Sequence, residues 1–444
     1  MIAQLFDLVR RSAGAAAADC LWRRSERTSV AFESGRLKAA GITQEAGVNL
    51  RVVSGGRVGI AGSTAVDAAP AELVARALAA AELGEALALV FPASAPLPPV
   101  PTSFDRAASA PLDALIAIGR ELVERLAREG CQVNVTVERE IASTRVANTA
   151  GADGAYRSTG VAISAEVWRI SGNDVLAIGD GFEGADLPAP EALAALVRSV
   201  ESRLELALTV VDSPEGSLPV VFTPAGLSAL FLPVTQALSG KAVLQGISPL
   251  AGRLGEQVFD RAFTLADDPL TPGRAASRPI DDECVPSRAL ALVERGVVQH
   301  FMYDLETATR AGTASTGHGQ RGMFSKPVPG YSNMIFGDGK NVGARHVVPL
   351  LGGGLITDIK DGLLVDDLIG VGQGNVIGGA FSHPVALAYR IERGEITGRV
   401  KDAAIAGNSY ELLKRIGGVG NDRRWYGARS APSLLLEGVS VARR

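Results

Sequence analysis

The sequence of 444 residues predicts an α+β protein, in which an amino-terminal antiparallel sheet with covering helices precedes a β-rich, barrel-like or sandwich carboxy-terminal domain. Segments of alternating apolar and polar residues fill the first half of the chain, and amphipathic helical patterns lie between them. Short apolar runs punctuated by glycine fill the second half. We therefore expect an amino-terminal α+β unit at residues 1–104, a central α+β unit at 105–213 and a β-rich unit at 214–444.

The first unit begins with an amphipathic helical pattern at residues 2–18 and continues as an antiparallel meander. Its strand candidates, separated by the turn signals Ser34-Gly35 and Ser54-Gly55-Gly56, are residues 28–33, 46–53 and 57–63. Ala71 to Leu89 are expected to form a helix. The proline-rich run from Pro92 to Phe104 cannot continue that helix, so it predicts a stiff linker and a unit boundary.

The central unit repeats this combination of helices and alternating segments. Helices are expected at residues 112–128 and 191–208, and strands within residues 131–151, 156–170 and 174–179. Ser213, Pro214 and Gly216 mark the next boundary. The alternation is compatible with one continuous sheet through both amino-terminal units, covered by helices on one face.

The third unit opens with the run from Leu218 to Gly240, which contains no Asp, Glu, His, Lys, Arg or Cys. Pro219 to Phe222 are a strand candidate, and Thr223 can cap a helix that begins at Pro224. Prolines and a glycine interrupt the run, and it is shorter than a membrane span. It therefore predicts a buried core helix.

Glycines separate the strand candidates that follow in this unit. These candidates include Leu355 to Ile359, Leu363 to Leu368, Ala386 to Ile391 and the closing run SLLLEGVSVA. Many short strands at close spacing favour a barrel or a sandwich.

Charge and cysteine content narrow the classes of function. A net charge of −4 provides no electrostatic footprint for nucleic acid. Cys20, Cys131 and Cys284 are odd in number and far apart, which suggests neither a disulfide framework nor a zinc knuckle. Asp7 and Arg10 interrupt the first apolar stretch before it resembles a signal peptide. We expect a cytoplasmic protein that binds neither nucleic acid nor a membrane.

Motifs for nucleotide binding and serine hydrolysis are incomplete. Gly372 to Gly378 approach the dinucleotide fingerprint, but the last glycine comes one residue late and the segment lies between strand candidates. The chain has neither a P-loop nor a G-x-S-x-G elbow.

Three adjacent carboxylates, Asp281, Asp282 and Glu283, could bind a cation, raise one another's pKa or accept the amino terminus of a peptide. The alternative, which we favour, is a solvated turn or a hydrogen-bonded corner between Pro279 and Pro286.

The chain contains few side chains that could bind a metal or act as a thiol nucleophile. The four histidines are His300, His318, His346 and His383, and no two have the spacing that lets one helix present both to a metal. We therefore expect no metal site in this chain. A dyad of Cys284 and His300 would lack an orienting group, so a buried, inert cysteine is expected.

Several ordered motifs resemble the TldD/PmbA family, once called modulators of DNA gyrase. The segments SGKAVLQGISPLAGRLGEQVFDRAFTLADDP, RPIDDECVP and LVERGVVQHFMYDLETATRAGTASTGHGQR resemble its carboxy-terminal half, and VAFESGRLKAAGITQEAGVNLRVVSGGRVGIAGST resembles its opening sheet. Members of the TldD type carry an HExxxH zinc helix where this chain has its apolar helix. The chain therefore resembles the PmbA/TldE branch, which lacks the HExxxH motif.

The resemblance also marks individual positions of the family cleft. Asp281, Asp282 and Glu283 match a recurrent DDEG-like segment, in which Cys284 replaces a glycine whose presence suggests a special backbone angle. Thr316, Gly317, His318 and Arg321 match a TGN-R pattern with histidine in place of asparagine. Asn333, Gly407 and Asn408 match further marks. These residues are expected either to line a peptide groove or to serve as turn residues, and Arg321 to pair with a peptide carboxylate or with the Asp281 cluster.

The resemblance implies a subunit of a heterodimeric cytosolic metalloprotease that acts on unfolded or extended peptides, in peptide maturation and antitoxin degradation. Zinc is then expected in a TldD-type partner subunit, no cofactor in this chain, no catalytic residue in this chain, and a possible homodimer when the chain is alone. Two alternatives are a self-sufficient homodimeric peptidase with an unrecognised site and a non-proteolytic interaction protein, such as a gyrase modulator.

Overall fold

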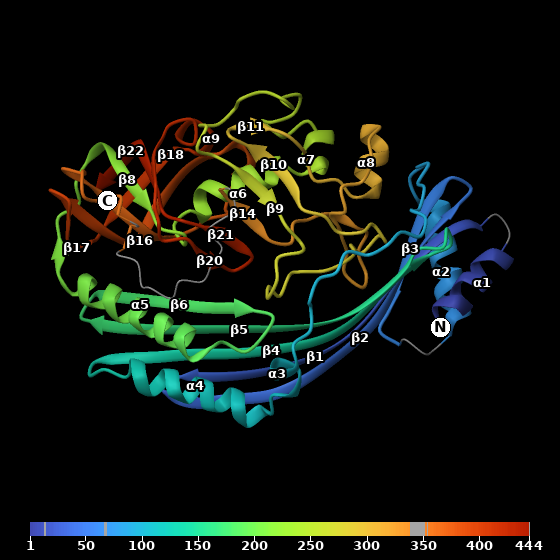
Figure 1. Ribbon diagram of the computed structural model, residues 1–444, viewed down its shortest axis with the longest axis horizontal. Coiled ribbons are helices and arrows are strands. Elements are labelled where there is room, and N and C mark those ends of the chain that lie inside the picture. Colours follow the sequence, from blue (N-terminus) through green and yellow to red (C-terminus); the bar gives the residue numbers. More distant parts are fainter. Residues whose placement is uncertain (13–14, 66–68, 338–350, 353, 444) are drawn as a thin grey trace.

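The computed structural model describes residues 1–12, 15–65, 69–337, 351–352 and 354–443. A long curved sheet from the first half of the chain lies beneath a β-rich domain from the second half, which packs on its concave side (Figure 1). This is the α+β architecture that the sequence predicts.

The curved sheet has six antiparallel strands. They are β1 (Ala15–Glu33), β2 (Arg36–Ser54), β3 (Arg57–Ser63), β4 (Cys131–Asn148), β5 (Asp153–Ser171) and β6 (Asp174–Gly184), in the spatial order β3-β2-β1-β4-β5-β6. The strands of both predicted amino-terminal units belong to this one sheet, because β1 pairs with β4 from Asp19 opposite Asn148 to Phe32 opposite Val135. The predicted boundaries at residues 104 and 213 stay predictions.

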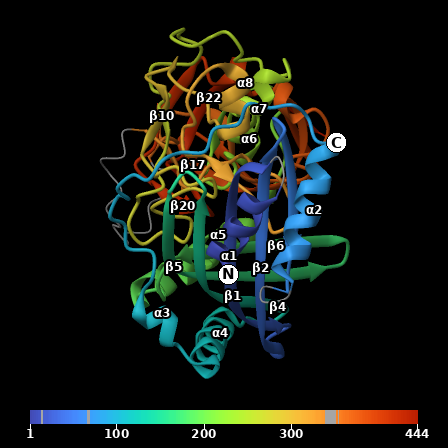
Figure 2. The same ribbon diagram turned by 90° about the vertical axis from the view of Figure 1, so that its right-hand side faces the viewer.

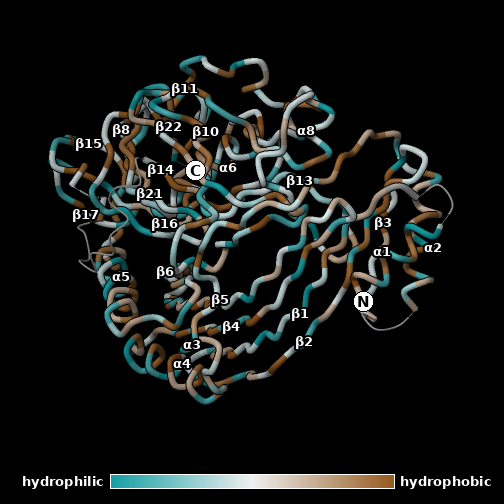
Figure 3. Tube along the Cα trace, turned by 45° about the vertical axis from the view of Figure 1, so that its right-hand side comes forward, coloured by the Kyte–Doolittle hydropathy of each residue, from teal (hydrophilic) through white to brown (hydrophobic). Residues whose placement is uncertain are grey.

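Strand alternation gives the sheet two different faces, visible as alternating colours along β1, β4 and β5 in Figure 3. Val135, Val137 and Ile163 lie on one face and pack with the helices α4 (Leu112–Leu126) and α5 (Pro190–Leu208). The opposite face carries Thr136, Thr144 and other polar residues, and it turns towards the β-rich domain. Period-two patterning thus decides which face meets the helices and which meets the second domain.

Two helices cover the narrow end of the sheet, which faces the viewer in Figure 2. Helices α1 (Ile2–Arg11) and α2 (Pro70–Leu83) bury Leu5 and Leu73 with Leu50 of β2. Helix α2 ends six residues before the predicted Leu89, where the amide of Gly84 donates to the carbonyl of Ala81. Between this end and β4, the short helix α3 (Asp105–Ser109) precedes α4.

A closed barrel forms the centre of the β-rich domain, so the structure selects the barrel alternative. Its five strands are β8 (Gly216–Phe222), β15 (Asp361–Leu368), β16 (Ala380–Glu392), β18 (Ala403–Asn408) and β22 (Leu434–Arg443), and pairing of β15 with β16 closes the ring. The strands β7 (Val210–Val211), β17 (Glu395–Val400) and β19 (Ile416–Val419) extend it.

A second sheet and short helices flank the barrel. The sheet consists of β11 (Val297–Val298), β10 (Leu290–Glu294), β9 (Leu265–Asp267), β14 (Met334–Phe336), β21 (Arg429–Ala431) and β20 (Arg424–Tyr426), in this order. A separate pair joins β12 (Gly319–Gln320) to β13 (Val328–Pro329). The helical segments are α6 (Ser228–Ala237), α7 (Gly240–Leu244), α8 (Leu305–Ala311), η1 (Val376–Gly378) and α9 (Ser409–Leu412).

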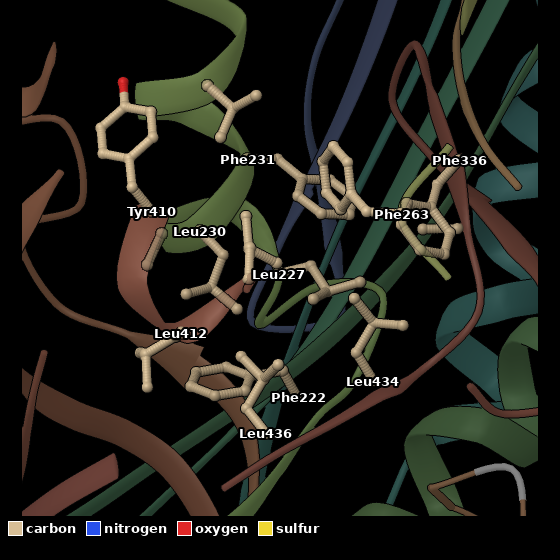
Figure 4. Close-up of a cluster of buried hydrophobic side chains, with 14 of the residues drawn as sticks. Phe222, Leu227, Leu230, Phe231, Phe263, Phe336, Tyr410, Leu412, Leu434 and Leu436 are labelled. Atoms are coloured by element: carbon tan, nitrogen blue, oxygen red, sulfur yellow. The ribbon is translucent and has the colours of Figure 1, made fainter. Parts of the chain in front are cut away.

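Helix α6 is the predicted core helix, and Figure 4 shows its apolar side chains among those of the barrel. Phe231 stacks on Phe336, with ring centroids 5.6 Å apart, and meets Phe263 edge to face. The helix begins at Ser228 and not at Pro224, because a turn comes first in which the Thr223 hydroxyl accepts from the Gly226 amide. Pro233 lacks the amide that would bond to Ala229, whose carbonyl instead accepts from the Ser409 hydroxyl.

The predicted strand from Leu355 to Ile359 is wrong. These residues form turns, because Gly352 and Gly354 have positive φ angles that break an extended path. Leu355 and Ile356 are partly buried and pack on an apolar cluster that includes side chains of the barrel strands β8 and β15, so their hydrophobicity reflects packing and not strand pairing. In the described ranges, no helix combines the length and the apolar character needed to cross a membrane.

Candidate functional site

A cleft of about 1030 Å³ lies between the polar face of the curved sheet and the β-rich domain. Arg23, Thr144 and Tyr156 contribute the wall on the sheet side. The opposite wall comes from one side of α6, with Leu232, Thr235 and Gln236, and from α7. The loops at residues 275–282 and 320–332 close the remaining sides. An elongated opening between two domains is a common location for a ligand site.

The α6 wall of the cleft contains no group that binds zinc. Its sequence, SALFLPVTQA, has no His, Cys, Asp or Glu. Elsewhere in the part of the chain that the structure describes, no group of three or more such side chains is placed to hold a metal ion. The described cleft residues therefore do not fit a zinc ion, and His346 lies outside the described residues.

The acidic segment forms a buried, hydrogen-bonded corner instead of a solvated turn. One carboxylate oxygen of Asp281 accepts from the amides of Glu283 and Val285, and the other accepts from the amide of Gly319. Burial raises the pKa of Asp281 to about 6. Cys284 has a φ of 67°, the left-handed conformation that the glycine of the related motif suggested, and its thiol is buried.

Glu283 points from this corner into a buried chain of charges that joins the two domains. Its carboxylate lies 2.7 Å from Nη1 of Arg51 on β2 and 2.7 Å from the amide of Leu305. Arg51 also contacts both carboxylate oxygens of Asp19 on β1, at 3.1 and 2.5 Å. Arg321 contacts Asp19 at 2.9 Å. The corner is therefore anchored to the curved sheet by buried hydrogen bonds through Arg51.

The environment sets the ionisation of this chain of charges. Burial raises the pKa of Glu283 to about 8, against the lowering effect of Arg51. Burial acts in the same sense on Asp19, but Arg321 and Arg51 together hold its pKa below the ordinary value. No side chain fits beside the Glu283 carboxylate at Gly319, since a Cβ atom there would collide with it.

His318 belongs to a second hydrogen-bonded group next to the corner. Its Nδ1 lies 2.9 Å from the hydroxyl of Thr316, and its Nε2 lies 3.2 Å from Asp267. Asp267 also accepts from the amide of Asn333 at 2.7 Å, and the Asn333 side chain donates to Ser277. Gly317 has a positive φ of 79°, so it turns the chain between Thr316 and His318.

The structure thus brings together eight of the ten predicted site residues, from Asp281 to Asn333, in one region. Of these eight, only Asp282 and Arg321 line the cleft. The Arg321 side chain pairs with Asp19 and not with the Asp281 cluster, whereas its amide donates to Asp282 at 2.9 Å. A direct role of these residues in peptide binding stays a prediction.

Gly407 and Asn408 lie apart from the cleft wall, at the end of β18. The Asn408 side chain accepts from the amides of Tyr410 and Glu411, so it caps α9. Its amide group also donates to the carbonyl of Gly378. The contacts of this pair are those of turn residues, which was the alternative to a peptide groove.

The Cys284–His300 dyad gains no support from the geometry. Burial raises the pKa of the Cys284 thiol, which disfavours the thiolate. His300 is exposed, and its Nδ1 lies 2.8 Å from the carbonyl oxygen of Ala291.

Sequence reasoning missed Asp19, Arg51 and Arg278. Asp19 and Arg51 occupy strands at positions where the neighbouring residues, such as Leu50 and Val52, are buried. A charged residue in the buried half of a strand was the available signal, because such a residue needs a partner of opposite charge.

The raised pKa of Glu283 predicts that the free energy of unfolding depends on pH. Its folded pKa of about 8 exceeds the ordinary 4.5, so the folded state holds a proton that the unfolded state releases between these values. The stabilisation is present at low pH and is lost as the pH rises through about 8. Between about pH 6 and pH 8 we expect the free energy of unfolding to fall by on the order of 2 kcal/mol.

Urea denaturation across this pH range measures the effect. In Glu283→Gln, a neutral side chain of the same shape, the fall should be largely absent, because Asp281 titrates at lower pH. An equal fall in the wild type and in Glu283→Gln would show that another group causes it.

Comparison with known proteins assigns the chain to a family. A family model described as PmbA/TldA metallopeptidase C-terminal domain matches residues 215–443, and one described as PmbA/TldA metallopeptidase domain 1 matches residues 18–81. The chain belongs to the PmbA/TldA metallopeptidase family, which confirms the TldD/PmbA resemblance.

The alignments to individual relatives extend over most of the chain in some cases and over about half of it in others. A metalloprotease of Methanothermobacter thermautotrophicus is 27% identical over 412 residues, which span 90% of this chain and 87% of the relative. The metalloprotease TldD homolog of Haemophilus influenzae is 32% identical over 212 residues, which span 47% of this chain and 42% of the relative. The crystal structure of TldE from Thermococcus kodakarensis superposes with a TM-score of 0.87 at 25% identity, over 99% of both chains.

Proposed function

We propose that this chain is the TldE-type subunit of a two-subunit peptidase, whose TldD-type partner carries the zinc site. The observation that carries the proposal is the α6 wall of the cleft. In a metallopeptidase family, that wall presents Leu232, Thr235 and Gln236 and no zinc ligand. The similarity to TldE along 99% of the chain is consistent with this role.

In this proposal the chain contributes binding and stability to the complex. Its cleft holds an unfolded or extended peptide along the polar face of the curved sheet, where side chains such as Tyr156 and Ser158 offer hydrogen bonds. The buried corner at Asp281 and Glu283 fixes the loops beside the cleft relative to the sheet. Peptide maturation and antitoxin degradation are the processes that we propose for the complex, in the cytoplasm.

Cleavage of an unstructured peptide tests the proposal. We expect no cleavage by this chain alone, and cleavage by its mixture with a TldD-type partner that exceeds the cleavage by the partner alone. Chelator should abolish the activity, and bound metal should be found only in the partner.

The other two functions predict different results in the same assay. Cleavage by this chain alone would establish a self-sufficient peptidase. Unchanged activity of the partner in the mixture, despite binding to this chain, would favour a non-proteolytic interaction protein. Genomic proximity to a gene for an HExxxH-bearing relative would support the two-subunit complex.

A further inference from the structure

Arg278 lies in the wall of the cleft with an incomplete set of partners. The residue is 8% exposed and follows Ser277 in the loop that closes the cleft. Nη1 lies 3.7 Å from Asp282, beyond hydrogen-bonding distance, and Nε and Nη2 are buried without a hydrogen-bond partner. Burial lowers the pKa of Arg278, but Asp282 and Asp281 raise it above the ordinary value, so the guanidinium stays charged while two of its nitrogens lack hydrogen bonds.

Two buried arginines away from the cleft, Arg51 and Arg203, are paired more completely. Arg51 makes three short contacts to Asp19 and Glu283. Arg203 contacts Asp366 at 2.6 Å and donates to the carbonyls of Ser199 and Gly179. Arg278 differs from these two arginines and resembles Arg321, which also lines the cleft and whose Nε and Nη2 also lack a hydrogen-bond partner.

The lining of the cleft as a whole carries more positive than negative side chains, although the carboxylates of Asp281 and Asp282 lie close to Arg278. The charged residues that line the cleft are Arg23, Lys241, Arg278, Asp282 and Arg321. Asp282 already accepts from the amide of Arg321, and Arg23 pairs with Glu140 outside the lining. Lys241 is exposed, and no carboxylate of the described residues lies within ion-pair distance of it. An anion that enters the cleft thus meets Arg278, which makes no hydrogen bond to any carboxylate within the described ranges, and Lys241.

We propose that the cleft binds a carboxylate of the peptide on Arg278, with Lys241 adding long-range attraction. This inference rests on the proposed function and names its substrate class: peptides with a free carboxyl terminus or an acidic side chain. Arginine suits the task because its planar N–H groups match the two oxygens of a carboxylate. The carboxyl terminus and an acidic side chain both offer a carboxylate, and peptides that differ in these two groups distinguish them.

Fluorescence anisotropy with labelled, unstructured peptides measures the preference, using the full chain alone and with a TldD-type partner. The peptide set combines Glu or Gln at one internal position with a free or amidated carboxyl terminus. We expect wild type to bind the carboxylate peptides about tenfold more tightly than the neutral peptide, and Arg278→Gln to lose this preference. Arg278→Lys should retain part of it, since the charge remains.

Arg261→Gln is the matched control, because Arg261 is exposed and lies outside the cleft. If Arg278→Gln loses the preference for a free carboxyl terminus, Arg278 binds the α-carboxylate of the peptide. If it loses the preference for Glu over Gln, Arg278 binds the acidic side chain. Equal binding of all peptides by wild type, or an equal weakening of all peptides in Arg278→Gln, would overturn the inference and leave the proposed function standing. Absence of binding to any peptide, with and without the partner, would overturn both. Thermal unfolding of Arg278→Gln verifies that the variant folds.

Discussion

Arg51→Met is expected to lower the free energy of unfolding by about 3–5 kcal/mol, because it removes the cation between two buried carboxylates. Asp19 and Glu283 are fully buried, and each makes a contact of 2.7 Å or less with Arg51. Methionine fills most of the same volume, so the loss reports on charge and hydrogen bonding more than on a cavity. Asp19 would retain Arg321, whereas Glu283 would retain only the Leu305 amide.

Urea denaturation measures this loss, and it should grow with pH. At low pH Glu283 is neutral in both proteins, whereas above about pH 8 the wild type gains an ion pair with Arg51 that the variant cannot form, since loss of Arg51 raises the pKa of Glu283 further. Adding Glu283→Gln to Arg51→Met should therefore recover part of the stability, most clearly at high pH.

Arg145→Met is the matched control for Arg51→Met. Arg145 also pairs with an aspartate, Asp153, at 2.5 Å, but both side chains are about half exposed. The exposed pair is expected to contribute less than about 1 kcal/mol. If Arg51→Met and Arg145→Met lowered the free energy of unfolding by the same amount, the buried contacts of Arg51 would not be what holds the corner to the sheet.

Local patterns predicted the elements of the fold well and their long-range pairing poorly. Alternation from Ala46 to Val53 and from Cys131 to Gly151 indicates strands because it reflects one buried face. That β1 lies between β2 and β4 depends on contacts over more than one hundred residues, which no local pattern contains. Leu355 to Ile359 show the opposite case, in which partly buried apolar residues of a turn imitate a strand.

Features of the site could be predicted from the sequence where the residue type restricts the backbone conformation. A glycine-like position at Cys284 was inferred from the related motif, and the structure gives this residue a positive φ. The roles of Asp281 and Glu283 could not be deduced, because they depend on Gly319, Arg51 and the amide of Leu305, all distant in sequence. Arg278 carries no sequence signal, since its significance lies in the partners that it lacks.

Building an HExxxH motif into α6 tests whether this helix belongs to the core or can become a metal site. The variant Leu227→His, Ser228→Glu, Leu232→His places the motif at the position that the family resemblance indicates. Leu227 is 1% exposed and lies near Phe222 and Leu434 in the core (Figure 4). We expect a loss of about 4 kcal/mol or more in the free energy of unfolding, because the change removes buried apolar contacts and inserts a polar ring without a partner.

The position of each residue on α6 separates the core effect from the cleft effect. Leu232 lines the cleft and is only partly buried, so Leu232→His alone should cost about 1 kcal/mol and serve as the control. Ser228 accepts from Arg429 at 2.7 Å, and a glutamate there could keep an ion pair with that arginine. Most of the loss should therefore follow Leu227→His when the single variants are compared by urea denaturation. A stable triple variant that binds zinc stoichiometrically would show instead that α6 can rotate its core face into the cleft. The absence of ligands from its wall would then reflect side-chain identity alone and not the packing of the helix.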